Sequence, residues 1–394
     1  MPHGRRGALT LRIGLNLTYL VEDSGGSGTY ARQLLPHLLL ADQDVELTAW
    51  IGATAPEWLA HEPWAERVRW ITLPVRGIGS PWHMWHELVG IGLDARRRKI
   101  DLVHGLANLG PLVHPGVVTV TTILDVIWVH HPEAAGLLFR AIGRTVTPSV
   151  ARSSARVIAI SEAARDDIAA TLRLDVEKFD VTPLGIDLPS PAGVPPDPRV
   201  VRNRLGLGPE PIILCVAAKR AHKNLDGLIR AIALLGESPL QLVLPGSAND
   251  YERELRALAL ELGVEDRVRF PGWVSDVDLE DLYRTAACFV LPSFQEGFGL
   301  PVLEAMARGV PVACSDTSSL PEVVGDAALL FDPREESQIA AQIGRLLSEE
   351  ELAGTLVERG YRRCELFTWK RTAELTLDSY RRALAHPRYS PFPS

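Results

Sequence analysis

The chain has 394 residues, of which 46% are hydrophobic and 23% charged, and its formal net charge is −8. This length fits two or three domains with large buried cores, and the negative charge argues against a general nucleic-acid binder. The four cysteines are far apart and lie mostly in apolar runs, so neither a zinc site nor a disulfide framework is expected and a reducing, cytoplasmic location is favoured. No window is apolar enough to span a membrane, so any membrane contact would be peripheral, at its inner face.

Strand-like apolar runs alternate with helical patterns along the whole chain. The runs of the first half are 11–17, 47–51, 102–104, 117–121 and 157–160, and those of the second half are 212–217, 240–244, 268–270, 288–291, 310–313 and 328–331. This alternation predicts parallel sheets wound with helices, and hence an α/β fold with two Rossmann-like domains in tandem. A proline-rich linker at 183–198 separates the two series, and a last helix at about 370–385 is expected to pack back across the first domain.

Two segments of the first half stand out. A glycine-rich turn at 25–30, which contains Gly26 and Gly28, directly follows the first predicted strand. Glycines there let the backbone approach a bound phosphate or sugar closely, although such turns also serve simply to join a strand to a helix. Further on, Trp82 and Trp85 belong to an aromatic cluster whose flat rings suit a sugar or a lipid interface; the alternative is the start of a helix that faces the core.

Two acidic residues, Asp276 and Asp278, follow the run 268–270 in the second half. Their spacing is that of a metal-binding Asp-x-Asp motif, but a helical pattern begins directly after them. Ser275 or Asp276 as the helix N-cap explains the segment better, so no metal site is predicted.

The most specific pattern is the segment 296–305, which sets Glu296 and Glu304 eight positions apart around a glycine turn. The run 288–291 predicts a buried strand, and Pro301 is tolerated at the first position of a helix that Gly309 would close. Four residues, Gly297, Phe298, Gly299 and Leu300, therefore occupy the turn between strand and helix. The backbone N–H groups at such a helix start lack intrahelical partners and favour an anion, which predicts a metal-free seat for phosphate.

The two glutamates suit a phosphate ligand that carries further groups. Glu304 would add negative charge beside the phosphate seat, which makes sense if its oxygens accept hydrogen bonds from a diol such as a ribose. Glu296, on the loop, would face whatever is attached to the phosphates. The alternative is that Glu304 is an ordinary first-turn helix residue and Glu296 a solvated loop acid, but the combined pattern favours a nucleotide diphosphate.

Two tandem doubly wound domains with this segment resemble the GT-B retaining glycosyltransferases of family 4, and the resemblance covers nearly the whole chain. The combination of 296–301 with the turn 318–322 is most similar to a branch that contains many mannosyltransferases. The resemblance implies two Rossmann-like domains that face a central cleft. Residues 1–188 would form the acceptor-binding domain, with a C-terminal helix at about 370–394 packing back on it, and residues 189–369 the nucleotide-sugar-binding domain.

The resemblance also implies roles for residues outside the segment 296–305. Lys223 matches a basic residue that neutralises the leaving diphosphate. The family's partner arginine falls near Ala218 here, so Lys219 or Arg220 would supply the second charge. Gly26 and Gly28 match a donor-binding, glycine-rich loop.

In the first domain, Asp125 matches the acidic member of the family's His-Asp site. Leu124 stands where histidine is common, which puts the usual rate or donor geometry in doubt. The acceptor is bound by the first domain in this family, and the candidates there are Trp82, Trp85 and His130.

The predicted activity is therefore retaining transfer of a hexose from a nucleotide-diphosphate sugar to an acceptor hydroxyl. GDP-mannose is the leading donor, and Glu296, Lys223 and Asp125 are the candidate catalytic residues. The acceptor would be a carbohydrate, a lipid-linked sugar or a small molecule, and no cofactor beyond the sugar nucleotide is expected. The alternatives are a sugar phosphorylase on the same scaffold and, because of Leu124, a catalytically weak subunit that binds sugar nucleotides.

Overall fold

The computed structural model describes residues 10–22, 25–75, 79–132, 136–188 and 197–385. The chain divides into two units, one made of Met1–Gly185 with Trp369–Ser394 and the other of Ile186–Thr368. The sequence-based expectation placed these boundaries after residues 188 and 369. Most of the predicted proline-rich linker, 189–196, and the last residues of the chain, 386–394, lie outside the described residues.

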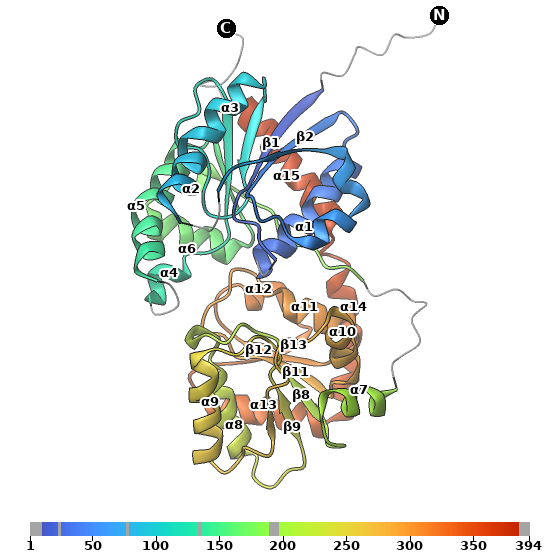
Figure 1. Ribbon diagram of the computed structural model, residues 1–394. Helices are drawn as coiled ribbons and strands as arrows, with labels where there is room; N and C mark the ends of the chain where they lie inside the picture. Colours follow the sequence, from blue (N-terminus) through green and yellow to red (C-terminus); the bar gives the residue numbers. More distant parts are fainter. Residues whose placement is uncertain (1–9, 23–24, 76–78, 133–135, 189–196, 386–394) are drawn as a thin grey trace, which may run out of the picture. The chain divides into compact units, whose positions relative to one another are not determined.

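The first unit contains a seven-stranded parallel sheet in the order β3-β2-β1-β4-β5-β6-β7. Figure 1 shows β1 and β2 of this sheet, which are paired side by side. Its strands are β1 (Leu11–Leu17), β2 (Val45–Ile51), β3 (Val68–Thr72), β4 (Leu102–Gly105), β5 (Val118–Ile123), β6 (Arg156–Ala159) and β7 (Phe179–Val181). In the centre of the sheet, Ile13 of β1 is paired with Leu47 on one side and Leu102 on the other. The strand order reverses between β1 and β4, and such a switch point is where doubly wound sheets bind ligands.

Helices cover both faces of this sheet. The longer helices are α1 (Gly25–Ala41), α3 (Ile91–Arg97), α5 (Leu137–Ser153), α6 (Glu162–Leu172) and α15 (Trp369–Leu384). Two helices are shorter, α2 (Pro81–Trp85) and α4 (Ile127–His130), and a π-helical turn, η3 (His86–Gly90), follows α2. The 3-10 turns are η1 (Glu57–His61), η2 (Pro63–Arg67) and η5 (Val176–Lys178). The helix α3 packs Ile91 and Ala95 against Trp50 of β2. The helices α1 and α15 contact each other, and they lie on the face that carries His104 and Thr122.

Buried polar contacts fix the C-terminal helix α15 to the first unit. His104 of β4 is hydrogen-bonded through Nδ1 to the Tyr380 hydroxyl of α15 at 2.7 Å and through Nε2 to the Thr122 hydroxyl of β5 at 2.7 Å. Burial lowers the pKa of His104 to about 3, so the ring is neutral and both nitrogens are used. Thr372 of α15 adds a hydrogen bond of 2.7 Å to the carbonyl of Pro183. The last helix therefore packs on the first half of the chain.

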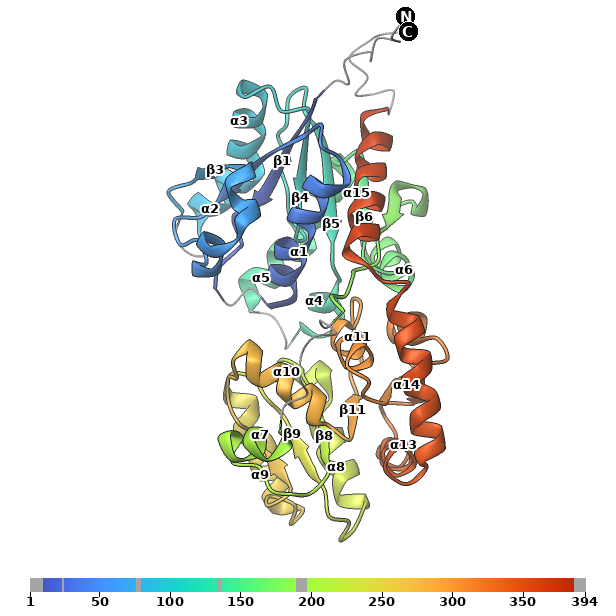
Figure 2. The same ribbon diagram turned by 90° about the vertical axis from the view of Figure 1, so that its right-hand side faces the viewer.

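The second unit contains a six-stranded parallel sheet in the order β10-β9-β8-β11-β12-β13. Figure 2 shows its strands β8 and β9, which are paired side by side. The strands are β8 (Ile212–Leu214), β9 (Gln241–Val243), β10 (Val268–Arg269), β11 (Cys288–Leu291), β12 (Val312–Ser315) and β13 (Ala328–Phe331). The helices are α7 (Pro198–Leu205), α8 (Leu225–Leu234), α9 (Asp250–Glu261), α10 (Asp276–Thr285), α11 (Leu300–Ala307), α12 (Leu320–Val324), α13 (Glu336–Ser348) and α14 (Glu350–Cys364), with a 3-10 turn, η6, at Ala221–Lys223. Here the switch point lies between β8 and β11.

Two doubly wound parallel sheets confirm the predicted α/β class. The predicted strands at 11–17, 288–291 and 328–331 have the same bounds as β1, β11 and β13. The strands β3 and β7 were missed, and both lie at the edges of the first sheet. An edge strand has one neighbour and is partly solvated, and polar residues interrupt both of these strands, Arg69 in β3 and Asp180 in β7, so neither forms a continuous apolar run.

Candidate functional site

An ion pair joins two of the predicted site residues at the switch point of the second unit. Lys223 follows β8 at the end of the η6 turn, and Glu296 lies in the loop after β11. Lys223 Nζ donates a hydrogen bond to Glu296 Oε1 at 2.7 Å, and their side chains are only 15% and 10% exposed. The hydroxyl of Ser293 donates to the same carboxylate oxygen at 2.7 Å. Adjacent strand ends therefore bring together two charges that are 73 residues apart in the sequence.

Two serines hold the carbonyl groups of the turn that follows Glu296. The Ser319 hydroxyl donates to the carbonyl of Glu296 at 3.1 Å and to that of Phe298 at 2.9 Å, and the Ser318 hydroxyl donates to the carbonyl of Glu296 at 2.6 Å. Because a trans peptide holds its N–H opposite its carbonyl, the N–H groups of Gly297 and Gly299 point away from the serines. The turn thus presents N–H groups at the start of α11, whose second residue, Pro301, has none of its own.

The shape of this turn requires a glycine. Gly299 has a φ of +103°, and a Cβ atom there would lie 2.6 Å from Leu320 Cδ2. Its neighbour Phe298 is 3% exposed and packs edge-on against Phe367, with ring centroids 5.6 Å apart. A close approach to α12 on one side and an aromatic anchor on the other therefore fix the turn.

Glu304 lies in the second turn of α11, where the Tyr283 hydroxyl of α10 donates to its Oε2 atom at 2.7 Å. Burial raises the pKa of Glu304, while this hydrogen bond and the positive charge of Arg308 oppose the shift. Among the described residues, none forms a hydrogen bond with the other oxygen, Oε1. Oε2 is therefore bonded within the fold, and Oε1 is the oxygen that could accept a hydrogen bond from a ligand. The sequence-based expectation was that both oxygens would bind a diol.

The two candidates for the second positive charge have different surroundings. The Lys219 ammonium is fully buried: it donates to the carbonyl of Gly246 at 2.6 Å and lies 3.2 Å from Glu252 Oε2. Burial lowers the pKa of Lys219, and the pairing with Glu252 opposes this. Arg220 is exposed on the same loop, and its carbonyl accepts the backbone N–H of Lys223. The structure therefore uses the charge of Lys219 inside the unit and leaves Arg220 as the exposed cation.

The predicted glycine-rich loop of the first unit is the beginning of a helix. Helix α1 starts at Gly25, so Gly26 and Gly28 lie in its first turn. A Cβ atom on Gly26 would have no heavy atom within 4 Å, whereas Gly28 is buried. The Tyr19 hydroxyl, from the end of β1, donates to the carbonyl of Ser27 at 3.3 Å. The segment is therefore a helix start and not a loop, and the donor-binding role of Gly26 and Gly28 stays a prediction.

Asp125 and His130 follow β5 and are held by separate contacts. Asp125 Oδ1 accepts the backbone N–H of Ile127 at 3.2 Å and so shapes the entry to α4. His130 Nε2 is 2.7 Å from Asp167 Oδ1 of α6, and its side chain is 42% exposed. Leu124 lies between the end of β5 and the start of α4, and its backbone N–H donates to Asn108 Oδ1 at 2.8 Å.

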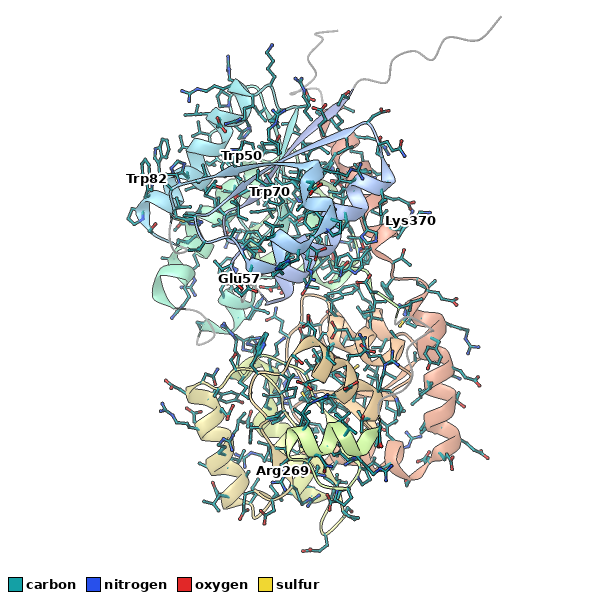
Figure 3. The ribbon with its side chains drawn as sticks, turned by 45° about the vertical axis from the view of Figure 1, so that its right-hand side comes forward. Trp50, Glu57, Trp70, Trp82, Arg269 and Lys370 are labelled. Atoms are coloured by element: carbon teal, nitrogen blue, oxygen red, sulfur yellow. The ribbon has the colours of Figure 1, made fainter. Side chains whose placement is uncertain are left out.

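Trp82 and Trp85 form a stacked pair on the surface of the first unit. Their rings lie 5.2 Å apart at an angle of 6°, and the two side chains are 52% and 44% exposed. Figure 3 shows Trp82 at the margin of its unit, whereas Trp50 lies inside it. His86 packs edge-on against both rings of the pair. The alternative that these tryptophans face the core is therefore wrong.

Sequence reasoning missed a buried carboxyl group next to this pair. Glu87 is 2% exposed, and its Oε1 atom accepts the side-chain N–H of Asn16 at 3.0 Å. Burial raises the pKa of Glu87 to about 7, while the hydrogen bonds from Asn16 and Thr18 oppose the shift. His83, whose Nδ1 lies 3.6 Å from Glu87 Oε2, has its pKa lowered, mainly by burial. An asparagine within the apolar run 11–17 was the signal that could have indicated a buried polar partner.

The Asp276-x-Asp278 segment caps a helix, as predicted. The Ser275 hydroxyl accepts the backbone N–H of Asp278 at 3.1 Å, and Asp278 also pairs with Arg204. Within the described ranges, no group of three or more His, Cys, Asp or Glu residues is arranged to hold a metal ion. In the same part of the chain, no helix has both the length and the apolar character needed to cross a membrane.

The sequence matches the family described as "Glycosyltransferase Family 4" over residues 24–189 and the family "Glycosyl transferases group 1" over residues 200–363. It is 32% identical over 322 residues to an MMP α-(1→4)-mannosyltransferase of Mycolicibacterium hassiacum, an alignment that covers 74% of this chain and 73% of that relative. It is 33% identical over 233 residues to O-antigen chain mannosyltransferase B of Escherichia coli, which covers 58% of this chain and 61% of the relative. The crystal structure of Anabaena HepE in complex with UDP-glucose superimposes with a TM-score of 0.74 at 20% identity, covering 94% of this chain and 99% of that one.

The buried carboxyl group of Glu87 predicts a pH-dependent stability. Its pKa is raised in the folded chain, so its contribution to stability is fully present below the unfolded value of 4.5 and is lost as the pH rises toward about 7. The difference between 4.5 and about 7 corresponds to about 3 kcal/mol. Glutamine does not titrate, so the Glu87→Gln variant does not lose this contribution. Between pH 4.5 and pH 8, the free energy of unfolding of the wild type should therefore fall by about 3 kcal/mol relative to that of Glu87→Gln.

Urea unfolding at both pH values checks this prediction. The groups that face the carboxyl group are Asn16, Thr18, Tyr19 and His83. Glu66→Gln, at an exposed glutamate of the same unit, is the matched control. Equal stability differences for Glu87→Gln at the two pH values would show that Glu87 titrates as an ordinary glutamate.

Proposed function

Since this chain belongs to the glycosyltransferases of group 1 and family 4, we propose that it is a retaining hexosyltransferase that uses a nucleotide-diphosphate sugar. The predicted GT-B class, with two Rossmann-like domains, is confirmed by its structural neighbours. The observation that carries the proposal is the Lys223–Glu296 pair beside the N–H groups of the turn 297–300. A cation and the N–H groups of a helix start at a switch point are suited to a diphosphate.

The diphosphate of the donor would lie against the start of α11. Its negative charge would attract Lys223, whose Nζ atom lies 2.7 Å from Glu296 Oε1 in the structure. The exposed Arg220 would add a second positive charge near the diphosphate. Glu296 would then turn its acceptor oxygens to the hydroxyl groups of the donor sugar. Cations and N–H groups fixed before the reaction stabilise charge on the leaving diphosphate without reorganising during the step.

The reaction would proceed on one face of the sugar. The bond between the anomeric carbon and the β-phosphate oxygen breaks, and the acceptor oxygen forms its bond to the same carbon on the same face. The acceptor proton passes to the departing phosphate oxygen, so no protein base is needed. Lys223, Glu296 and Asp125 would act by positioning and electrostatics.

We propose GDP-mannose as the donor and the described residues as sufficient to bind it without a metal. The mannosyltransferase names of two relatives support the choice of mannose. The acceptor would be a carbohydrate, a lipid-linked sugar or a small molecule. The stacked and exposed Trp82–Trp85 pair supports an acceptor with an apolar face, such as a sugar ring.

A substitution of Lys223 tests the proposed catalytic role. Lys223→Met should lower the rate of GDP release from GDP-mannose by about 10² to 10³, because one preorganised donor to the leaving group is worth this much. The assay uses water and methyl α-mannoside as acceptors. Lys370→Met, at a lysine whose side chain is 79% exposed, is the control and should leave the rate unchanged.

An unchanged rate in Lys223→Met would contradict the catalytic role of this residue. A wild-type protein that binds GDP-mannose tightly but releases no GDP would instead be the weak subunit suggested by Leu124. Release that requires inorganic phosphate and a glycoside would indicate a phosphorylase.

The proposed contact between Glu304 and the ribose can be measured by a double-mutant cycle. Glu304→Gln should weaken GDP binding by about tenfold or more, because a hydrogen bond to a charged group contributes about 1.5–3 kcal/mol. The variant keeps an oxygen for the Tyr283 hydroxyl. If the carboxylate binds the diol, 2′,3′-dideoxy-GDP should bind the variant and the wild type equally. Additive losses in calorimetric titrations would place the ribose elsewhere.

A further inference from the structure

A buried chain of hydrogen bonds joins the helical segment behind Trp82 and Trp85 to the end of β1. Glu87 Oε1 accepts the side-chain N–H of Asn16 at 3.0 Å. Asn16 Oδ1 in turn accepts the backbone N–H of Thr18 at 3.2 Å and its hydroxyl at 2.9 Å. The exposed fractions of Glu87, Asn16 and Thr18 are 2%, 1% and 4%, so water does not compete for these contacts.

This arrangement sets the orientation of the Asn16 amide. An asparagine side chain donates from one end and accepts at the other. A carboxyl oxygen on the Nδ2 side leaves Oδ1 facing Thr18, where it satisfies a backbone N–H just beyond the last residue of β1, Leu17. The backbone N–H of Thr18 can only donate, so it also selects Oδ1, and Glu87 supplies the acceptor that holds the opposite, Nδ2 end of the same amide. Without Glu87 the amide would lose that anchor and would hold the N–H of Thr18 less firmly.

The segment that this turn begins leads to the first turn of α1. Tyr19 directly follows Thr18, and its hydroxyl donates to the carbonyl of Ser27 at 3.3 Å. Gly26, next to Ser27, has open space where a side chain would project. These residues lie where the strand order of the first sheet reverses, the place at which such sheets bind ligands. The chain of contacts that begins at Glu87 therefore reaches the edge of the first sheet where a ligand would bind.

A stability role alone does not explain the choice of a glutamate at this position. Glu87 Oε2 has no hydrogen bond within the described part of the chain, and a carboxyl group in such surroundings is unfavourable to bury. It lies in the π-helical turn His86–Gly90, and single π turns occur frequently at functional sites. Groups kept at a cost to stability are typical of residues that serve a site.

We propose that Glu87 is a positioning residue for the acceptor, which acts through Asn16 and Thr18 on the segment that ends in the first turn of α1. The proposed ligand of this segment is the sugar or polyol part of the acceptor, in place of the donor that the family resemblance assigns to Gly26 and Gly28. The kinetic part of this inference rests on the proposed function, whereas the structural part does not. Glu87 itself is buried and touches neither substrate.

The test compares Glu87→Leu with Glu87→Gln. Glutamine keeps a carbonyl oxygen for Asn16, and leucine does not. In Glu87→Leu, hydrogen–deuterium exchange of the amides of Thr18, Tyr19 and residues 25–30 should accelerate about tenfold, the factor that the loss of one hydrogen bond of ordinary strength allows. Glu87→Gln should exchange like the wild type. Asn16→Ala breaks the same chain of contacts at another link and serves if Glu87→Leu does not fold.

Kinetics supply the second readout. Glu87→Leu should raise the KM for methyl α-mannoside about tenfold, while the Kd for GDP stays unchanged because the nucleotide residues belong to the other unit. Glu66→Leu, at an exposed glutamate of the first unit, is the control for adding a leucine.

Three results would overturn the proposal: unchanged exchange in Glu87→Leu, faster exchange spread equally over the first sheet, or a Glu87→Gln variant that behaves like Glu87→Leu. A wild-type protein without transfer activity would count against the proposed function only, since the exchange measurement decides the positioning role by itself.

Discussion

The ion pair between Lys223 and Glu296 is the contact on which the proposed site of the second unit depends. It exists because β8 and β11 are neighbours at a reversal of strand order, so their loops meet. Burying two charges is costly even when they are paired, and the fold supports them with the Ser293 hydroxyl and with the glycine turn that follows. A preorganised pair of opposite charges beside the N–H groups of a helix start is suited to exchange one anion, the carboxylate, for another, a diphosphate.

Much of this site could be predicted from the sequence because its parts are local. The segment 296–304 contains its own strand end, glycine turn, helix start and two carboxylates, and the structure arranges them as their spacing indicates. Strands that form mostly apolar runs were found, including the edge strand β13, whereas polar residues interrupt the missed edge strands β3 and β7. The N-cap at Ser275 followed from the same kind of local rule.

The remaining features depend on tertiary contacts that no short segment encodes. Lys219 and Arg220 are adjacent and both positively charged, yet only the position of Glu252 and Gly246 decides that Lys219 is buried. Likewise, Glu87 and Asn16 are 71 residues apart, and neither is unusual alone. Burial gives Glu87 a pKa of about 7, so the first unit contains a group whose charge changes near neutral pH. Such groups become visible only once the packing is known.

We propose that the second unit holds a nucleoside diphosphate without a metal. Calorimetric titration of the whole protein with GDP, UDP, ADP and TDP, each in EDTA and again in magnesium, measures this binding. We expect GDP to bind most tightly, with the same affinity in EDTA as in magnesium. Failure of all four nucleotides to bind, or binding that depends on magnesium, would contradict it.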